Sequence, residues 1–168
     1  MKIAFISDVH GNMPALEICL KAISENGCSQ IYCLGDTFGY FQDGVKCYET
    51  LRSLGAEFIS GNHEAILLGN LTIEKKQEEV CRLNLERTCL SPEMRMNLNK
   101  LLPYKTVILP NEKKLLLVHG SPWDPLQGYV YPDSDLSPFN SLPYDYIFMG
   151  HTHHPFINVK SNTSIVNT

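Results

Sequence analysis

Apolar runs alternate with helix-like segments through the first third of the chain. Three of the runs have the β-rich composition of buried strands: residues 2–7 (KIAFIS), 30–34 (QIYCL) and 57–60 (EFIS). The segments between them, residues 14–26 and 44–54, are suited to helices. Pro14 fits the first turn of the earlier helix, and Gly27 fits its end. This βαβαβ order predicts a parallel sheet with helices packed on its faces.

The middle of the chain is a charged segment with helical character. We interpret residues 65–102 as an inserted helical pair. Ser91, Pro92 and Glu93 have the character of an N-cap, a first-turn proline and an early carboxylate at the start of its second helix. Residues 75–87 are highly charged, and we expect this surface to be a solvated face rather than a binding patch.

The second half of the chain has the pattern of short strands separated by turn residues. Five segments carry this pattern: residues 106–109 (TVIL), 114–118 (KLLLV), 146–149 (YIFM), 156–160 (FINVK) and 164–166 (SIV). Residues 121–145, rich in Pro, Asp, Ser and Tyr, lack periodicity, and we interpret them as a lid-like loop on the substrate side. No repeat or low-complexity tract divides the chain, so we expect one α/β domain over residues 1–168.

Composition and charge limit the classes of partner. The chain is 43% hydrophobic and 19% charged, as in a globular domain. A formal net charge of −4 argues against an extended nucleic-acid surface, which needs a basic footprint. The apolar run at the N-terminus is interrupted by Asp8 and His10 and fits neither a signal peptide nor a membrane span. We therefore expect a cytoplasmic protein with no membrane partner.

The cysteines have no metal-binding or disulfide pattern. All six lie in the first part of the chain without a CxxC pair: Cys19, Cys28, Cys33, Cys47, Cys81 and Cys89. We expect no disulfides, and we interpret these residues as small apolar filler in a reducing compartment.

Polar clusters follow five of the predicted strands. Their sequences are SDVHGN, GDTFGY, GNHEA, HGSP and GHTHHP. In sheets of this kind, ligands bind just beyond the carboxyl ends of the strands, so these clusters are expected to converge. Carboxylate, amide and imidazole groups together suit Mn²⁺, Fe, Zn²⁺, Ni²⁺ or Co²⁺ better than Ca²⁺. Two ions about 3.5–4 Å apart, sharing a carboxylate, would use the whole set and would suit phosphoryl-transfer hydrolysis.

The clusters resemble the successive signatures of calcineurin-like metallophosphoesterases. The matching motifs, in order, are Asp8-Val9-His10, Gly35-Asp36, Gly61-Asn62-His63-Glu64, Val118-His119-Gly120 and Gly150-His151-Thr152-His153. The chain is similar to the small bacterial and archaeal phosphodiesterase-like members over essentially its whole length. The resemblance implies a four-layer αββα sandwich, whereas the residue pattern by itself predicts only α/β. The chain stops at SIVNT, where relatives continue with further strands, which leaves open whether the second sheet is complete.

The resemblance also implies a role for individual residues. It assigns seven ligands to two divalent ions, Mn²⁺ first among the candidates: Asp8, His10 and His153 for one ion, Asn62, His119 and His151 for the other, and Asp36 as the bridge. A water or hydroxide shared by the ions is the implied nucleophile. His63 resembles the histidine that contacts phosphate and protonates the leaving oxygen. Glu64 is expected to orient an imidazole or a ligand from behind.

Each assignment has a structural alternative. Asp8 and Asp36 could be helix or turn caps, and His119 could be a core histidine. His151 and His153 have the spacing that places two side chains on one face of a strand, which favours a shared site. The recurrence of five clusters after five strands favours the metal site for all of them.

Several nearby residues are less specific. Asn12 follows a glycine and is a helix cap or, at most, a supporting residue of the site. Trp123, Asp124 and Tyr129 resemble a substrate-side stretch in a subgroup with the sequence HGSP-x-DPL, but an aromatic side chain there could equally pack the loop down. His154 is left out because an extended chain would point it to the other face.

The function expected from these residues is the hydrolysis of a small phosphate ester, with a phosphodiester or nucleotide-like substrate favoured. A phosphomonoesterase, a protein phosphatase and a dinucleotide polyphosphate phosphatase remain alternatives. A non-catalytic metal-binding scaffold on the same fold is a further alternative, although scaffold relatives characteristically lose metal ligands and this chain keeps the full set. A metal-binding sensor or storage protein, which would also keep its ligands, is another. An exposed edge strand in a short second sheet would favour a homo-oligomer.

Overall fold

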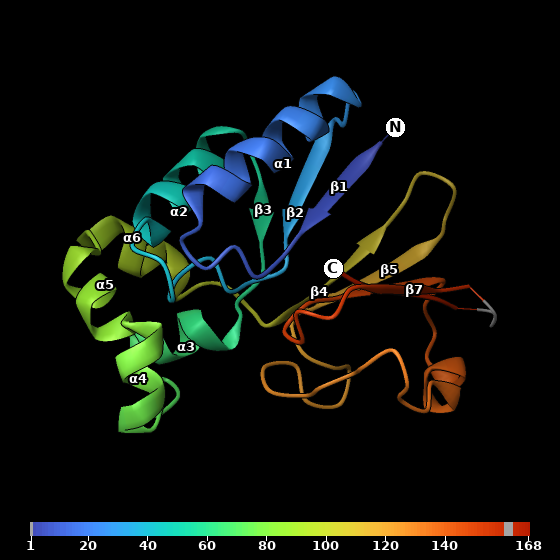
Figure 1. Ribbon diagram of the computed structural model, residues 1–168. Helices are drawn as coiled ribbons and strands as arrows, with labels where there is room; N and C mark the ends of the chain where they lie inside the picture. The colour runs from blue at the N-terminus through green and yellow to red at the C-terminus, as the bar shows by residue number, and fades with distance from the viewer. Residues whose placement is uncertain (1, 160–162) are drawn as a thin grey trace.

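Two β-sheets pack face to face at the centre of the protein (Figure 1). A computed structural model describes residues 2–159 and 163–168. Helices cover the outer face of the first sheet, and an irregular segment covers the outer face of the second. The α/β class agrees with the residue pattern, and the two packed sheets agree with the layered sandwich that the family resemblance implies.

The first sheet is parallel, as its βαβαβ pattern predicts. Its order is β1 (Ile3–Ile6), β2 (Gln30–Cys33) and β3 (Glu57–Phe58). Helices α1 (Met13–Glu25) and α2 (Gly44–Ser53) connect these strands. Because the strand order advances in one direction and such crossovers are right-handed, both helices lie on the same face.

The second sheet is mixed, with the order β4-β5-β6-β8-β7. Its strands are β4 (Tyr104–Ile108), β5 (Lys114–Val118), β6 (Tyr146–Met149), β7 (Phe156–Asn158) and β8 (Ser164–Asn167). Strands β5, β6 and β8 are mutually parallel, so the polar ends of β5 and β6 point the same way. The strand expected over residues 156–160 ends earlier, at Asn158: Val159 lies outside β7, and Lys160 lies outside the described residues.

The alternation of side chains between the two faces of each strand explains how the two sheets pack together. On β2 and just beyond it, Cys33 faces helices α1 and α2, whereas Tyr32 and Leu34 face the second sheet. Leu115 and Leu117 meet them from β5 in one apolar cluster. The rings of Phe5 and Phe148 stack across the interface, with centroids 3.7 Å apart.

The helical region differs from the expected pair. It contains α3 (Asn62–Leu68), α4 (Lys75–Cys81), α5 (Leu83–Cys89) and α6 (Pro92–Leu98). The expectation of two helices was wrong because Arg82, with a φ of 58°, breaks the charged stretch, and because a further helix begins inside the GNHE motif. The N-cap at Ser91 is confirmed, since its Oγ accepts the Met94 N–H at 3.1 Å.

The segment expected to be a lid mostly forms an outer layer. Val130, and Phe139 from the 3₁₀ helix η1 (Ser137–Ser141), pack into the cluster formed by the outer face of the second sheet. Residues 121–145 therefore supply the fourth layer, and the same segment contributes Gln127 and Tyr129 to a cleft described below.

The cysteines are free, in agreement with the sequence. Cys33, Cys47 and Cys81 are buried filler as expected, but Cys19 and Cys89 are exposed, which corrects that expectation for two of the six. Among the described residues, no helix combines the length and apolar character needed to cross a bilayer.

We predict that the apolar contact between the sheets dominates stability. Leu117 is fully buried there, at 0% exposure, and Leu117→Ala should lower the free energy of unfolding by about 2–5 kcal/mol in urea titrations. Ile108→Ala on the neighbouring strand is the control, because Ile108 is 68% exposed and its loss should cost less than about 1 kcal/mol. Equal losses in both variants would contradict this account of the core.

Candidate metal centre

The seven predicted ligands gather where strands of both sheets end. Asp8 and His10 follow β1, Asp36 follows β2, and Asn62 is the first residue of α3 after β3. The remaining three follow β5 and β6 of the second sheet: His119, His151 and His153. Contacts link these residues from five separate segments into one cluster between the sheet ends.

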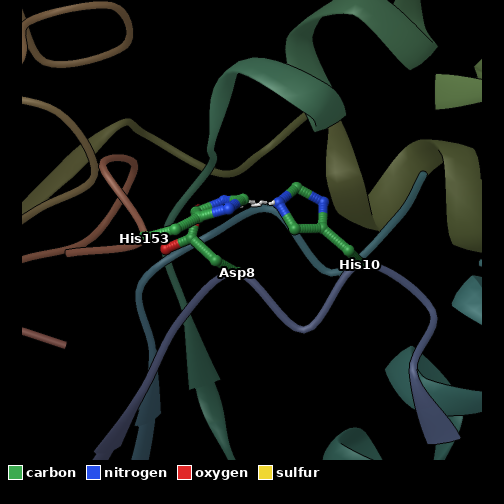
Figure 2. Close-up of side chains that lie close together, drawn as sticks. All are labelled: Asp8, His10 and His153. Atoms are coloured by element: carbon green, nitrogen blue, oxygen red, sulfur yellow. Dashed lines mark hydrogen bonds and ion pairs between the residues drawn. The ribbon is translucent and has the colours of Figure 1, made fainter. Parts of the chain in front are cut away.

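The first group consists of Asp8, His10 and His153 (Figure 2). The Nε2 atoms of the two histidines lie 3.0 Å apart. Asp8 Oδ1 is 3.3 Å from His153 Nε2 and 3.7 Å from His10 Nε2. Ligands about 2.0–2.2 Å from one ion lie roughly 3.0–3.6 Å apart, so the spacing of this group is close to that of a coordination sphere.

The second group is built around His119. Its Nε2 is 2.9 Å from Asn62 Oδ1 and 3.5 Å from Asp36 Oδ2. The His151 ring lies edge-on to the His119 ring, with centroids 5.0 Å apart. Asp36, His119 and His151 can each direct one ligand atom to a common point.

Asp36 lies between the two groups. Its Oδ2 is 3.9 Å from His10 Nε2 and 3.9 Å from His63 Nε2, in addition to its contact with His119. Its Oδ1 accepts the backbone N–H of His63 at 2.8 Å. The side chain is buried, at 2% residue exposure, so one oxygen is fixed by the backbone while the other faces the imidazoles.

Backbone carbonyls fix the orientation of three imidazoles. The Phe38 carbonyl lies 3.0 Å from His10 Nδ1 and 2.8 Å from His63 Nδ1. The Leu34 carbonyl lies 2.8 Å from His119 Nδ1. A carbonyl only accepts hydrogen bonds, so each Nδ1 donates, and in the neutral ring Nε2 presents a lone pair to the centre. Metal-binding histidines commonly have this arrangement.

Burial and charge shift the pKa values in the cluster. Burial lowers the pKa of His10 to about 4, so its ring is neutral at physiological pH. Burial would also lower the pKa of His119, but the Asp36 carboxylate outweighs it and raises that pKa to about 9. The pKa of Asp36 falls despite its burial because His119 and the neighbouring histidines stabilise the carboxylate. The cluster therefore attracts positive charge.

Two buried atoms in the cluster lack hydrogen-bond partners among the described residues, namely Asp8 Oδ1 and His151 Nε2. Asp8 Oδ1 is near His153 but outside hydrogen-bond geometry. A buried oxygen and a buried ring nitrogen without partners are costly unless another group satisfies them. Together with the O/N donor set, these atoms fit divalent transition-metal ions.

The ligand loops adopt an uncommon backbone conformation. Eight described non-glycine residues have positive φ, and five of them are predicted ligands: Asp8, His10, Asp36, His151 and His153. A positive φ is uncommon in residues other than glycine, and the residues that have it concentrate at functional sites. His151 and His153 thus share the site through a strained turn, with φ values of 69° and 54°, which corrects the expectation that strand alternation aligns them.

The supporting residues occupy more varied positions. Glu64 is buried and accepts the backbone N–H groups of Asp36, Thr37 and Gly61, each at 2.8 Å, so it anchors the loop of a predicted ligand rather than an imidazole. Asn12 caps α1, where its Oδ1 accepts the Ala15 N–H at 3.2 Å.

Of the three residues expected on the substrate side, Trp123 and Asp124 act within their own loop, whereas Tyr129 lines the cleft described below. The Trp123 ring packs edge-on against Phe139, with centroids 4.8 Å apart. Asp124 accepts the Gln127 N–H through Oδ1 at 3.1 Å and shapes the turn. Of the alternatives for Trp123, the geometry matches packing of the loop.

A cleft of about 510 Å³ opens over the cluster. Tyr40 lines it and lies edge-on to His10, with centroids 4.6 Å apart, and Tyr129 lies 4.3 Å from His151 by the same measure. Its other wall comes from the helical insertion and includes Lys76, Val80 and Cys81. Tyr40 was missed because the motif GDTFGY gives no sign that its last residue turns back over the site.

Glu86 of α5 was also missed. It belongs to the charged stretch that we expected to be a solvated face, yet it is 5% exposed, and its carboxylate contacts the loop after β2. This corrects the expectation for that stretch, because one of its charges points inward. The periodicity of this stretch did not reveal which of its charged residues would be buried, because breaks between the short helices interrupt the helical spacing.

Comparisons with known proteins agree with this geometry. The sequence profile of the calcineurin-like phosphoesterase superfamily domain matches residues 1–168. An uncharacterized protein of Methanocaldococcus jannaschii is 32% identical over 170 residues, which cover 98% of this chain and 67% of that protein. The crystal structure of a metallophosphoesterase from Sphaerobacter thermophilus is 27% identical with a TM-score of 0.78, covering 99% of this chain and 75% of that one. A hypothetical protein from Pyrococcus horikoshii OT3 has a TM-score of 0.82 at 20% identity, with 98% and 75% coverage, and this likeness shows the fold alone.

We predict that divalent ions bind more tightly as pH rises from 7 to 9. Because the pKa of His119 is raised to about 9, its ring carries a proton below that pH, and a cation must displace it. Displacement of one proton changes the apparent Kd about tenfold per pH unit. Calorimetric Mn²⁺ titrations in buffers of different ionisation enthalpy would count the released proton. His154→Gln, outside the cluster, should keep the same slope, and an affinity independent of pH over this range would contradict the prediction.

Proposed function

Because the chain belongs to the calcineurin-like phosphoesterase superfamily, we propose that it hydrolyses phosphate esters with the help of two divalent metal ions held by the cluster. The membership confirms the resemblance seen in the sequence, and the structural likeness confirms the fold. We further propose the number of ions, Mn²⁺ as the preferred metal, a preference for diesters and the role of each residue.

The two groups described above would each hold one ion. Asp8, His10 and His153 would bind the first, and the second would be bound by Asn62, His119 and His151. When bound, the ions supply positive charge for the phosphate oxygens and activate water as a nucleophile near neutral pH. The protein's part is to fix the donor atoms, which it does through the carbonyl contacts and the strained loops.

The observation that carries the proposal is the position of Asp36. One carboxylate oxygen lies within 3.9 Å of the Nε2 atoms of His10, His63 and His119, which come from different segments of the chain. A single ion bound by one group would leave the other donors unused. If two ions were bound, Asp36 would be the residue placed to contact both, and this would account for its position between the groups.

His63 is the proposed acid for the leaving group. Its Nδ1 donates to the Phe38 carbonyl, and the ring lines the cleft, so Nε2 is the atom available to the substrate. Because Nδ1 already carries a proton, the acid would be the imidazolium form of His63, whose Nε2 proton would pass to the leaving oxygen as the ester bond breaks and leave the ring neutral. The ring needs no metal contact for this role, which distinguishes it from the seven ligands.

The cleft favours a diester. A tyrosine lies beside each ligand group, Tyr40 near His10 and Tyr129 near His151. A phosphodiester has two organic substituents, and each would meet one aromatic ring, whereas a monoester would leave one ring without a partner. The apolar side chains of Ile66, Ile73 and Val80 extend this surface.

We predict that metal-stripped protein reloaded with Mn²⁺ hydrolyses bis(p-nitrophenyl) phosphate faster than p-nitrophenyl phosphate. His63→Asn should lower kcat by about 10²–10⁴-fold while two ions per chain remain bound, because the acid is lost and the ligands are not. Asp36→Asn should lose both the second ion and turnover, because the shared charge is removed.

Metal content by mass spectrometry and initial rates would be measured on the same samples, with His154→Gln as the unaffected control. A His63→Asn variant that loses metal would place His63 among the ligands. Two bound ions without turnover on either ester would favour a non-catalytic scaffold, and one bound ion would exclude the shared carboxylate.

A further inference from the structure

Glu86 holds the loop that carries the Phe38 carbonyl. It lies on α5, far along the chain from that loop, and its side chain is buried. Its Oε2 accepts the Gly39 N–H at 2.6 Å, and its Oε1 accepts the Gly44 N–H at 2.9 Å. Burial raises the pKa of this carboxyl, and the two N–H donors act in the opposite direction by stabilising the ionised form.

The Gly39 N–H and the Phe38 carbonyl belong to the same peptide group. One side of that group donates to Glu86, and the other accepts from the Nδ1 atoms of His10 and His63. A single peptide therefore connects a buried carboxylate to a predicted metal ligand and to the proposed leaving-group acid.

We propose that Glu86 is a positioning residue that orients and polarises His10 and His63 together through the Phe38–Gly39 peptide group. Hydrogen bonds in series strengthen one another in a low-dielectric interior, so a carboxylate on the N–H side makes the carbonyl a better acceptor. A better acceptor forms a stronger hydrogen bond with the Nδ1 proton. The imidazole ring then carries more electron density, which makes Nε2 a stronger electron-pair donor. Carboxylates that contact metal-binding histidines directly have this effect, and here a peptide group stands between them.

The local sequence is suited to this contact. Gly39 has a φ of 91°, and a Cβ there would lie 2.3 Å from His63 Nδ1. A Cβ on Gly44 would lie 2.1 Å from Glu86 Oε1. Both glycines therefore permit the close approach of the imidazole and the carboxylate to the backbone.

A third contact ties the same loop to the insertion. The Tyr40 N–H donates to the carbonyl of Cys81, at the end of α4, at 2.8 Å. The helical insertion thus holds the loop at Gly39, Tyr40 and Gly44, and α4 also lines the cleft through Lys76 and Val80. Of these three contacts, the two made by Glu86 involve a charged group, whereas the contact of Tyr40 is between backbone groups.

The test is the imidazole ¹H–¹⁵N spectrum of the metal-free protein, compared with Glu86→Gln. The Nδ1–H signals of His10 and His63 should move upfield and exchange faster with water. His119 is the internal reference, because its Nδ1 donates to Leu34 and its signal should stay in place. A further expectation rests on the proposed function: the affinity of Glu86→Gln for Mn²⁺ should be about 10–100-fold lower than that of the unaltered protein.

Two control variants separate this role from a structural one. Leu83→Ala removes a buried side chain from the same helix without touching the carboxylate. Glu93→Gln, on α6, removes a charge from the exposed ion pair that Glu93 makes with Arg52 of α2. Neither should reproduce the selective change at His10 and His63. The same shifts in Leu83→Ala, or unchanged shifts in folded Glu86→Gln, would overturn the proposal.

A measurement on the unaltered protein covers the case in which Glu86→Gln does not fold. Scalar couplings across hydrogen bonds should connect Nδ1 of both His10 and His63 to the Phe38 carbonyl carbon, and their absence would overturn the proposal. The spectra require neither bound metal nor turnover, so they test the role of Glu86 separately from the proposed function. The role of Glu86 could be supported even if the protein does not hydrolyse phosphate esters, and it could be refuted even if the protein does.

Discussion

The site depends on the burial of one carboxylate. Asp36 is almost fully removed from water, and an isolated buried charge would be strongly unfavourable. The structure compensates with the His63 N–H on one oxygen and with imidazoles around the other, and Glu64 fixes the backbone of Asp36 from behind. These partners come from both sheets and from α3. The need to satisfy this charge thus adds a polar connection at the strand ends between two sheets that the apolar cluster already joins.

Most of the fold was predictable because its signals are local. The apolar runs placed the strands to within about two residues, and the βαβαβ order predicted the parallel sheet. The helical insertion was less predictable, because the break at Arg82 depends on a left-handed backbone conformation that its residue type does not signal. The covering role of residues 121–145 depends on long-range packing of Val130 and Phe139, which no periodicity records.

The candidate ligands were predictable as a set because each follows a strand. Their geometry was not, because Asp8, His151 and His153 have left-handed backbone conformations that their residue types do not signal. Glu86 was hidden for a related reason. Its sequence neighbours are exposed charges, and only the tertiary approach of α5 to the loop after β2 distinguishes it from them.

The left-handed backbone at the ligand positions has a consequence for laboratory evolution. A non-glycine residue in that conformation costs on the order of 1 kcal/mol, and the His153 side chain is 50% exposed, so glycine at this position would relieve strain with little loss of packing. Selection for heat resistance alone would therefore favour the loss of a proposed metal ligand. Variants recovered from such a screen would be more stable but less able to bind metal, and a paired screen for turnover would be needed to retain His153.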